Sequence, residues 1–315
     1  MKGIGILLVI TAHFFSWDHP LLGRVITSFH MPMFFLVAGY FSKSFSTWDD
    51  AKQNVRKYGK RLLPAFAVTQ FFIILWAVLM AFTQADGWNP VIKESLSLIW
   101  ADPYGPRTPW GTLSIGIVWF LLALFIAKSI LLVLSRLGVW AIPVSIMLSL
   151  GAVLMYRAFP HSIWCISLGL TALPFVTIGW WFRTHKLPVW MVIVCIACWI
   201  AAILFSKLDM YEMEWGCYPL DFLGALGGTL CLYYICRFIG KRLPFTGRIL
   251  AILGIWSLAI MCFHDIETHC HLGNHVMAFF PFDLPVWGKF AFRYLLTIAL
   301  AALAVKTPVL KKVFV

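Results

Sequence analysis

Two ionisable side chains stand at the two ends of the first apolar segment of the chain. The segment reads KGIGILLVITAH and carries Lys2, His13 and no other charge. In a membrane helix, this spacing places both side chains on one face, about 16 Å apart along the axis. Ionisable groups in membrane helices mark functional sites, and an imidazole titrates near neutral pH. The pair therefore indicates a site with a cation and a proton acceptor. A cytoplasmic flank and an interfacial histidine would explain it too.

The composition is typical of a membrane protein. Of the 315 residues, 61% are hydrophobic and only 12% are charged, whereas charged residues approach a quarter of a soluble domain. The apolar runs are long and continuous, which favours helices over the alternating strands of a barrel. We predict an all-α fold, a polytopic integral membrane helical bundle in a single domain over 1–315. About ten transmembrane helices are expected near 2–16, 22–42, 62–83, 113–135, 139–157, 163–184, 188–206, 219–239, 248–264 and 287–305.

The predicted topology explains the net charge of +12. With both termini in the cytoplasm, most of the 25 Lys and Arg residues fall in cytoplasmic loops, as the positive-inside rule describes. Membrane lipid is therefore the expected partner of these charges, and nucleic acid is not. The first span reaches only about 15 residues where a full span needs about 20. Either the start of the chain is missing, or this helix is short and buried among others.

Further candidate residues lie in or beside the next apolar segments. His30 opens the stretch HMPMFFLVAGY, in which Pro32 removes a backbone donor and predicts a kink. Arg61 stands at the membrane edge in RLLP, and Trp119 lies within VWFLLALF, where we expect it to pack inside the bundle. The loop SKSFSTWDDAKQNVRKYGKR predicts a short surface helix. Its basic face would suit lipid or nucleotide phosphates, although the topology signal alone explains it too.

The ninth predicted span ends in SLAIMCFHDIE, which brings His264 to the outer boundary. Five more ionisable residues follow closely, and they could form either a metal site or a simple polar loop. The spacing H-x-C-x-H is not one of the familiar zinc patterns, and we therefore predict no metal. The five residues are Asp265, Glu267, His269, His271 and His275.

Together these segments resemble the membrane-bound acyltransferase family 3, in the branch of the fucose 4-O-acetylase-like and related sugar acetyltransferases. The first helix of that family carries Arg, ten residues and then His, and here Lys2 and His13 occupy that frame. Lysine keeps the charge of arginine but loses its bidentate fork. FHMPMFFLVAGYF resembles the second-helix signature. Later landmarks follow in the expected order: Arg61-Leu62-Leu63-Pro64, Trp119-Phe120-Leu121 and Gly254 through Ser257 to His264.

The resemblance implies an O-acyltransferase of the bacterial inner membrane. It would move acetyl from acetyl-CoA, its donor substrate, to a hydroxyl of a cell-envelope glycan or lipid-linked sugar, with no bound cofactor. A sugar hydroxyl is a poor nucleophile near pH 7, so a general base is needed, and His13 fits that role. Lys2 and Arg61 would meet the acyl-CoA. The remaining candidates would support the site or bind the acceptor: His30, Trp119 and His264.

Two other functions compete with an acyltransferase. A transporter or flippase could pass protons along His13, His30 and His264, but we find no internal repeat and no mid-membrane carboxylates. The chain could also be a non-catalytic scaffold or sensor, in which lysine in place of arginine at position 2 marks the loss of activity. Release of free CoA from labelled acetyl-CoA, with envelope glycans present, would separate the three.

Overall fold

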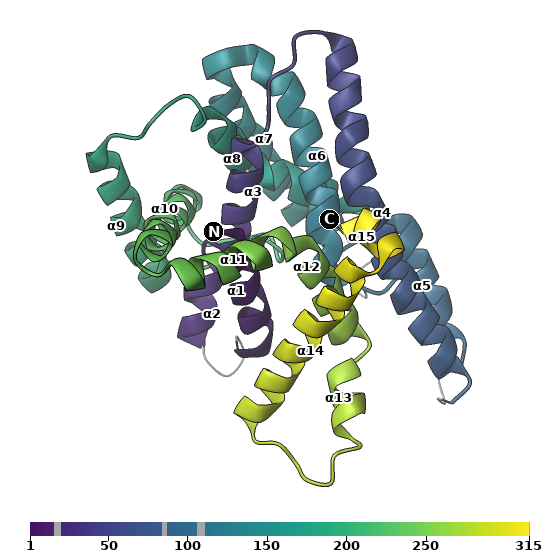
Figure 1. Cartoon of the computed structure of the whole chain (residues 1–315). Helices are drawn as coiled ribbons and strands as arrows, with labels where there is room; N and C mark the ends of the chain where they lie inside the picture. Colours follow the sequence, from purple (N-terminus) through teal and green to yellow (C-terminus); the bar gives the residue numbers. More distant parts are fainter. Residues whose placement is uncertain (16–19, 84–86, 106–110, 315) are drawn as a thin grey trace. The chain divides into compact units, whose positions relative to one another are not determined.

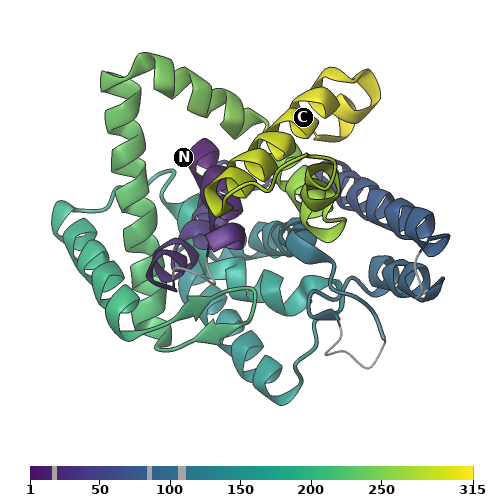
Figure 2. The same ribbon diagram turned by 90° about the horizontal axis from the view of Figure 1, so that it is seen from below.

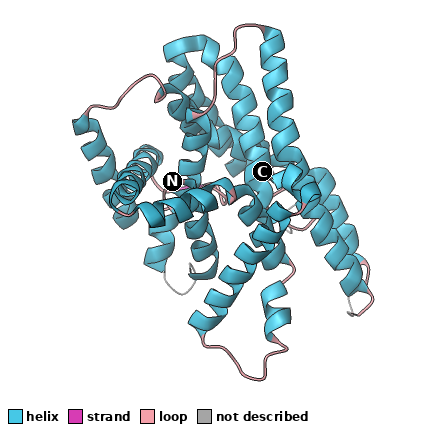
Figure 3. Cartoon of the chain, in the orientation of Figure 1, coloured by secondary structure: helices cyan, strands magenta, loops and turns pink. Residues whose placement is uncertain are grey.

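The chain is almost entirely helical (Figure 3). The computed structural model describes residues 1–15, 20–83, 87–105 and 111–314. Within these, the only strands are β1 and β2, an antiparallel pair in which Leu208 lies opposite Trp215. The prediction of an all-α fold is confirmed.

Figure 1 labels the elements along the chain. Their order and bounds are α1 (Lys2–Phe15), α2 (Pro20–Thr27), α3 (His30–Tyr40), α4 (Trp48–Ala81), α5 (Asn89–Trp100), η2 (Gly116–Val118), α6 (Trp119–Leu134), η3 (Ser135–Trp140), α7 (Ala141–Ala158), η4 (Ile163–Cys165), α8 (Ile166–Trp181), α9 (Val189–Phe205), β1 (Leu208–Asp209), β2 (Glu214–Trp215), α10 (Tyr218–Arg242), α11 (Pro244–Ile255), α12 (Ser257–His269), α13 (Leu272–Met277), α14 (Val286–Lys306) and α15 (Pro308–Phe314).

The helices divide between two compact units, and each unit is discontinuous in the sequence. Unit 1 holds α1 to α3, α7 to α10 and most of α6 and α11. Unit 2 holds α5 and α12 to α15. The residue ranges are 1–58, 123–159 and 167–254 for unit 1, and 59–122, 160–166 and 255–315 for unit 2.

Six helical stretches of the described chain are long and apolar enough to cross a membrane. A seventh is the pair α11 and α12, if this pair, bent by 66°, is one span. Each of the ten predicted spans falls on a helix, but α1 and α9 are short, and Gly116–Ala158 counts as one stretch of 43 residues. The chain is therefore a multi-pass membrane protein by its helices, and the number ten stays a prediction, as do the orientation of the termini and the single domain.

The surface of α9 is what a lipid-facing helix requires. Val189, Trp190, Ile193, Leu204 and Phe205 are all exposed. In water, a row of large apolar side chains of this kind would mark a partner surface. Next to lipid tails, the same exposure carries no hydrophobic penalty.

The basic loop before the third span is not a separate surface helix. α4 begins at Trp48 and continues through the predicted span to Ala81, a single helix of 34 residues. Thr47 and Asp50 start it, because each donates its backbone N–H to the other's side chain, at 3.1 and 3.2 Å. Pro64 inside the helix removes only one backbone donor. The expectation of two helices was therefore wrong.

The predicted break in the second span is present, just before Pro32. α2 ends at Thr27 and α3 begins at His30, so Pro32 lies in the first turn of α3. There its missing N–H has no intrahelical acceptor to lose. Ser28 stands four residues before Pro32, at the position whose carbonyl the proline ring obstructs, and the interruption lies at Ser28 and Phe29 within a stretch, Pro20–Tyr40, that counts as one span. The predicted proline break is therefore confirmed.

Glycines let the helices of unit 1 approach backbone to backbone. α9 and α10 pack along each other (Figure 2), and a Cβ on Gly227 would lie 1.9 Å from the carbonyl oxygen of Cys195. α3 and α8 meet in the same way at Gly39 and Gly179. Small residues at such crossings allow tight packing in membranes. The close helix packing predicted from LGALGG is confirmed.

Candidate functional site

The first helix carries Lys2 and His13 as predicted. α1 runs without interruption from Lys2 to Phe15, so the two side chains share a face, about 16 Å apart along the axis. Lys2 is half-buried, whereas His13 is exposed at the other end of the helix. The imidazole of His13 is therefore accessible, whereas protein covers part of the Lys2 side chain.

The start of α1 is fixed by a backbone contact with α11. A Cβ on Gly3 would lie 2.0 Å from the carbonyl oxygen of Leu250 and 3.2 Å from the backbone nitrogen of Gly254. Only glycine permits this approach. The position of Lys2, next to Gly3, thus depends on α11, whose Gly254 belongs to one of the later motifs of the sequence.

His30 lies in the same unit as His13 and close enough for an electrostatic interaction with it. It is buried at the start of α3, and its Nδ1 lies 2.8 Å from the carbonyl oxygen of Ile26. Because a carbonyl can only accept, Nδ1 carries the proton, and the neutral ring has its lone pair on Nε2. The break between α2 and α3 therefore exposes the carbonyl group that orients His30.

In unit 2, the segment with Trp119 packs against the segment with His264. Both side chains are buried, with 4% exposed in each case. The contact is made through their neighbours, since Oδ1 of Asp265 accepts the backbone N–H of Ile117 at 2.6 Å. Gly116 has a φ of +66°, and a Cβ there would lie 2.1 Å from the same oxygen. A glycine is needed for the loop to reach the carboxylate.

A buried polar cluster surrounds this carboxylate. Nε2 of His269 donates to the carbonyl oxygen of Ser114 at 3.0 Å, and its Nδ1 lies 3.6 Å from Oδ1 of Asp265. Glu94 interacts electrostatically with both residues, and burial raises the pKa of its carboxyl group. Among the described residues, three buried oxygens here have no hydrogen-bond partner: Oδ2 of Asp265, Oε2 of Glu94 and Oε1 of Gln70.

Two other ionisable residues of the histidine-rich stretch, Glu267 of α12 and His275 of α13, have a structural explanation. Glu267 is buried and binds Arg293 of α14 through two hydrogen bonds of 2.7 and 3.0 Å. His275 packs against the ring of Trp76. No group of three or more potential ligands suits a metal ion anywhere in the described ranges.

The predicted site residues fall into two sets. Lys2, His13 and His30 belong to unit 1, whereas Arg61, Trp119 and His264 belong to unit 2. The structure brings His13 and His30 together, and it brings the segments of Trp119 and His264 together. Arg61 is exposed on α4. A single site formed by both sets stays a prediction.

The cluster of Glu94, Asp265 and His269 was not recognised as a unit from the sequence. Asp265 and His269 stand in the histidine-rich stretch, but Glu94 lies in a different segment. The sequence feature that could have indicated this cluster is Gly116, which precedes Val118-Trp119-Phe120 by one residue, because an isolated glycine often marks a close backbone approach.

A family model described as an acyltransferase domain matches residues 1–306 of the chain. No curated protein and no solved structure matches the chain. The matched range includes the candidate residues of both units and all the predicted spans.

Proposed function

Because the chain belongs to acyltransferase family 3 and is therefore an enzyme that transfers acyl groups other than aminoacyl groups, we propose that it acetylates a sugar hydroxyl. The donor is acetyl-CoA, and the acceptor is a glycan or lipid-linked sugar of the cell envelope. The enzyme lies in the bacterial inner membrane with both termini in the cytoplasm, as its basic residues suggest. The observation that supports this most is the arrangement on α1, with an exposed His13 and a half-buried Lys2 on one face.

The proposed reaction requires one base and one cation. His13 takes the proton of the acceptor hydroxyl while its oxygen attacks the thioester carbonyl. The tetrahedral intermediate expels CoA as a thiolate, which receives the proton from the imidazolium. Lys2, one helix length away, meets a phosphate of CoA as a point charge.

The remaining predicted residues support these two. His30 presents the lone pair of Nε2, so it can accept a hydrogen bond from the acceptor hydroxyl or from protonated His13. Trp119 and His264 shape the acceptor side from the buried segments of unit 2. Arg61, which is exposed, adds a second cation for the CoA phosphates.

The test uses the purified full chain with labelled acetyl-CoA, and measures free CoA with and without envelope glycans. His13→Gln removes the proton acceptor but keeps a hydrogen-bonding side chain, so turnover should fall about 10²–10⁴-fold. His275→Gln, an exposed histidine packed on Trp76, is the matched control and should keep normal turnover. Near-normal turnover in His13→Gln would defeat the general-base role.

A further inference from the structure

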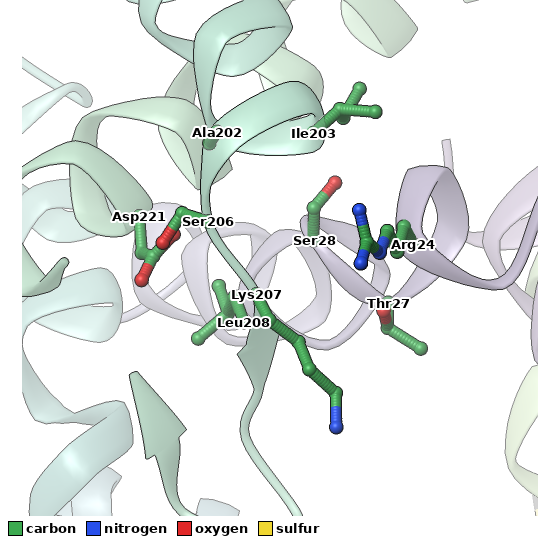
Figure 4. A pocket seen from close by; sticks show the side chains of 9 residues that line it. All are labelled: Arg24, Thr27, Ser28, Ala202, Ile203, Ser206, Lys207, Leu208 and Asp221. Carbon is green, nitrogen blue, oxygen red and sulfur yellow. The ribbon is translucent and has the colours of Figure 1, made fainter. Parts of the chain in front are cut away.

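The hollow of unit 1 shown in Figure 4 is too small for a substrate. It lies between the ends of α2 and α9, β1 and the start of α10, and its volume of about 10 Å³ is the space of about one water molecule. Its polar lining, which includes Arg24, Ser206 and Asp221, therefore cannot hold a ring. A larger interaction surface lies on unit 2.

Large aromatic side chains are exposed where α13 connects to α14 in unit 2 (Figure 1). The aromatic loop, residues 278–287, reads AFFPFDLPVW and ends in the first turn of α14. The exposed fraction is 88% for Phe279, 62% for Phe282 and 66% for Trp287. Large apolar side chains gathered in one exposed segment mark an interaction surface.

The aromatic loop has a defined conformation in which one ring faces inward. The ring of Phe280 packs edge-to-face on Phe292 of α14, with the ring centroids 5.3 Å apart. Nζ of Lys289 lies 2.9 Å from Oδ1 of Asp283, so α14 also neutralises the charge of the loop. These two contacts hold the loop against α14 while the neighbouring rings stay exposed.

The backbone of the loop requires a polar environment. The N–H groups of Phe282, Asp283 and Leu284 form no hydrogen bond with any residue that the structure describes. In the hydrocarbon core of a bilayer each unpaired N–H is costly, whereas water and lipid headgroups can accept a hydrogen bond from it. Pro281 and Pro285 have no N–H and add nothing to this demand. The backbone therefore suits the headgroup level, whereas the aromatic rings favour an apolar phase.

Lipid is the apolar phase nearest to the loop. α14 begins at Val286 and is long and apolar enough to cross a membrane, so lipid surrounds it from about the point at which the loop ends. Tryptophan is enriched at the membrane–water interface, and Trp287 stands in the first turn of this span. The pair of Asp283 and Lys289 leaves no unbalanced charge in the loop that would attract a charged partner.

We propose that the aromatic loop is an interfacial lipid anchor, with its backbone among the headgroups and the rings of Phe279, Phe282 and Trp287 at the upper acyl chains. The anchor is independent of the proposed function, since it needs no acyl donor or acceptor. It sets the depth of α14 in the bilayer. Because Arg293 of α14 is bound to Glu267 of α12 by two hydrogen bonds, it also sets the depth of α12.

The test replaces Phe279 or Phe282 by the photoreactive residue p-benzoylphenylalanine in the full chain, reconstituted in vesicles of phosphatidylcholine. On irradiation the benzophenone bonds to a nearby C–H group, and mass spectrometry measures the fraction of the chain that carries a lipid. Ile193, which is exposed on the apolar helix α9, is the lipid-facing control position. Asp49, whose side chain is 85% exposed at the polar start of α4, is the matched polar control.

A phenyl ring favours an apolar phase over water by more than about tenfold. The lipid yield at positions 279 and 282 should therefore exceed the yield at position 49 about tenfold and approach the yield at position 193. Yields as low as at position 49 would overturn the anchor. So would covalent dimers in place of lipid adducts, which would assign the loop to a second copy of the chain, or sugar adducts in place of lipid adducts once envelope glycans are added.

Trp287 provides a second measurement that needs no unnatural residue. The fluorescence lost in Trp287→Phe is the emission of Trp287, and brominated phosphatidylcholine should quench it, most strongly when the bromine is near the headgroup. If one benzophenone variant fails to fold, the other position and this measurement decide. Emission of Trp287 that brominated lipid leaves unchanged would refute the lipid contact.

Discussion

The contact between Gly3 and Leu250 provides a direct test of how α1 is held. In an open helical position, changing Gly to Ala stabilises a helix by about 1 kcal/mol. At Gly3 the new methyl carbon would lie 2.0 Å from the carbonyl oxygen of Leu250, whereas real Cβ contacts essentially never fall under 3.0 Å. The two backbones must therefore separate by about 1 Å, since neither atom belongs to a flexible side chain.

Overpacking of this kind costs about 1–3 kcal/mol. Gly151→Ala in α7 is the matched control, because a Cβ there meets nothing within 4 Å. Gly151 lies in the interior of α7 and gains the full helix propensity, whereas Gly3 lies in the first turn of α1 and gains less, so a difference beyond about 1 kcal/mol reports the clash. Thermal unfolding of the purified chain in detergent should place Gly3→Ala several degrees below Gly151→Ala. Acyl transfer should also fall, because α1 carries Lys2 and His13. Equal unfolding temperatures would refute the packing argument.

Three further predictions concern single charges. Lys2→Ala should raise the KM for acetyl-CoA more than it lowers kcat, and Lys2→Arg should keep activity, measured by steady-state kinetics; an unchanged donor KM would leave Lys2 as a topology flank. Glu267→Gln should destabilise the chain by about 3 kcal/mol in thermal unfolding, because Arg293 loses a buried bidentate partner; an unchanged unfolding temperature would contradict this. Burial raises the pKa of Glu94 above 4.5, so the folded chain keeps a proton that the unfolded chain releases, and stability falls as pH rises from 4.5 through the folded pKa. Glu94→Gln should flatten that fall in unfolding temperatures measured across pH, and an unaltered slope would disprove it.

The sequence was sufficient for features that repeat along one helix. The spacing of Lys2 and His13 needs only the helical period, and the close packing of α10 needs only its run of small residues. Both follow from local rules that hold wherever a helix forms. The length and apolar character of the segments likewise predicted a multi-pass helical protein.

Contacts between distant segments could not be predicted in this way. Asp265 binds the N–H of Ile117 across 148 positions of the chain, and no periodic pattern connects them. Glu94 joins the same cluster from a third segment. The continuity of α4 was missed for a different reason, since the change from polar to apolar residues marks the edge of a membrane and not the end of a helix.

α4 is longer than the hydrocarbon core of a bilayer is thick. Its 34 residues rise about 51 Å, whereas the hydrocarbon core is about 30 Å thick. The apolar part follows Arg61, so about the first 20 Å of the helix are polar, and Ala51 there forms a buried cluster with Leu132 of α6. The lysines and arginines of this polar part lie at successive distances from the apolar part along the helix axis. Added salt should therefore weaken the attraction to lipid headgroups first for the charges farthest from the apolar part, and last for the charges nearest to it.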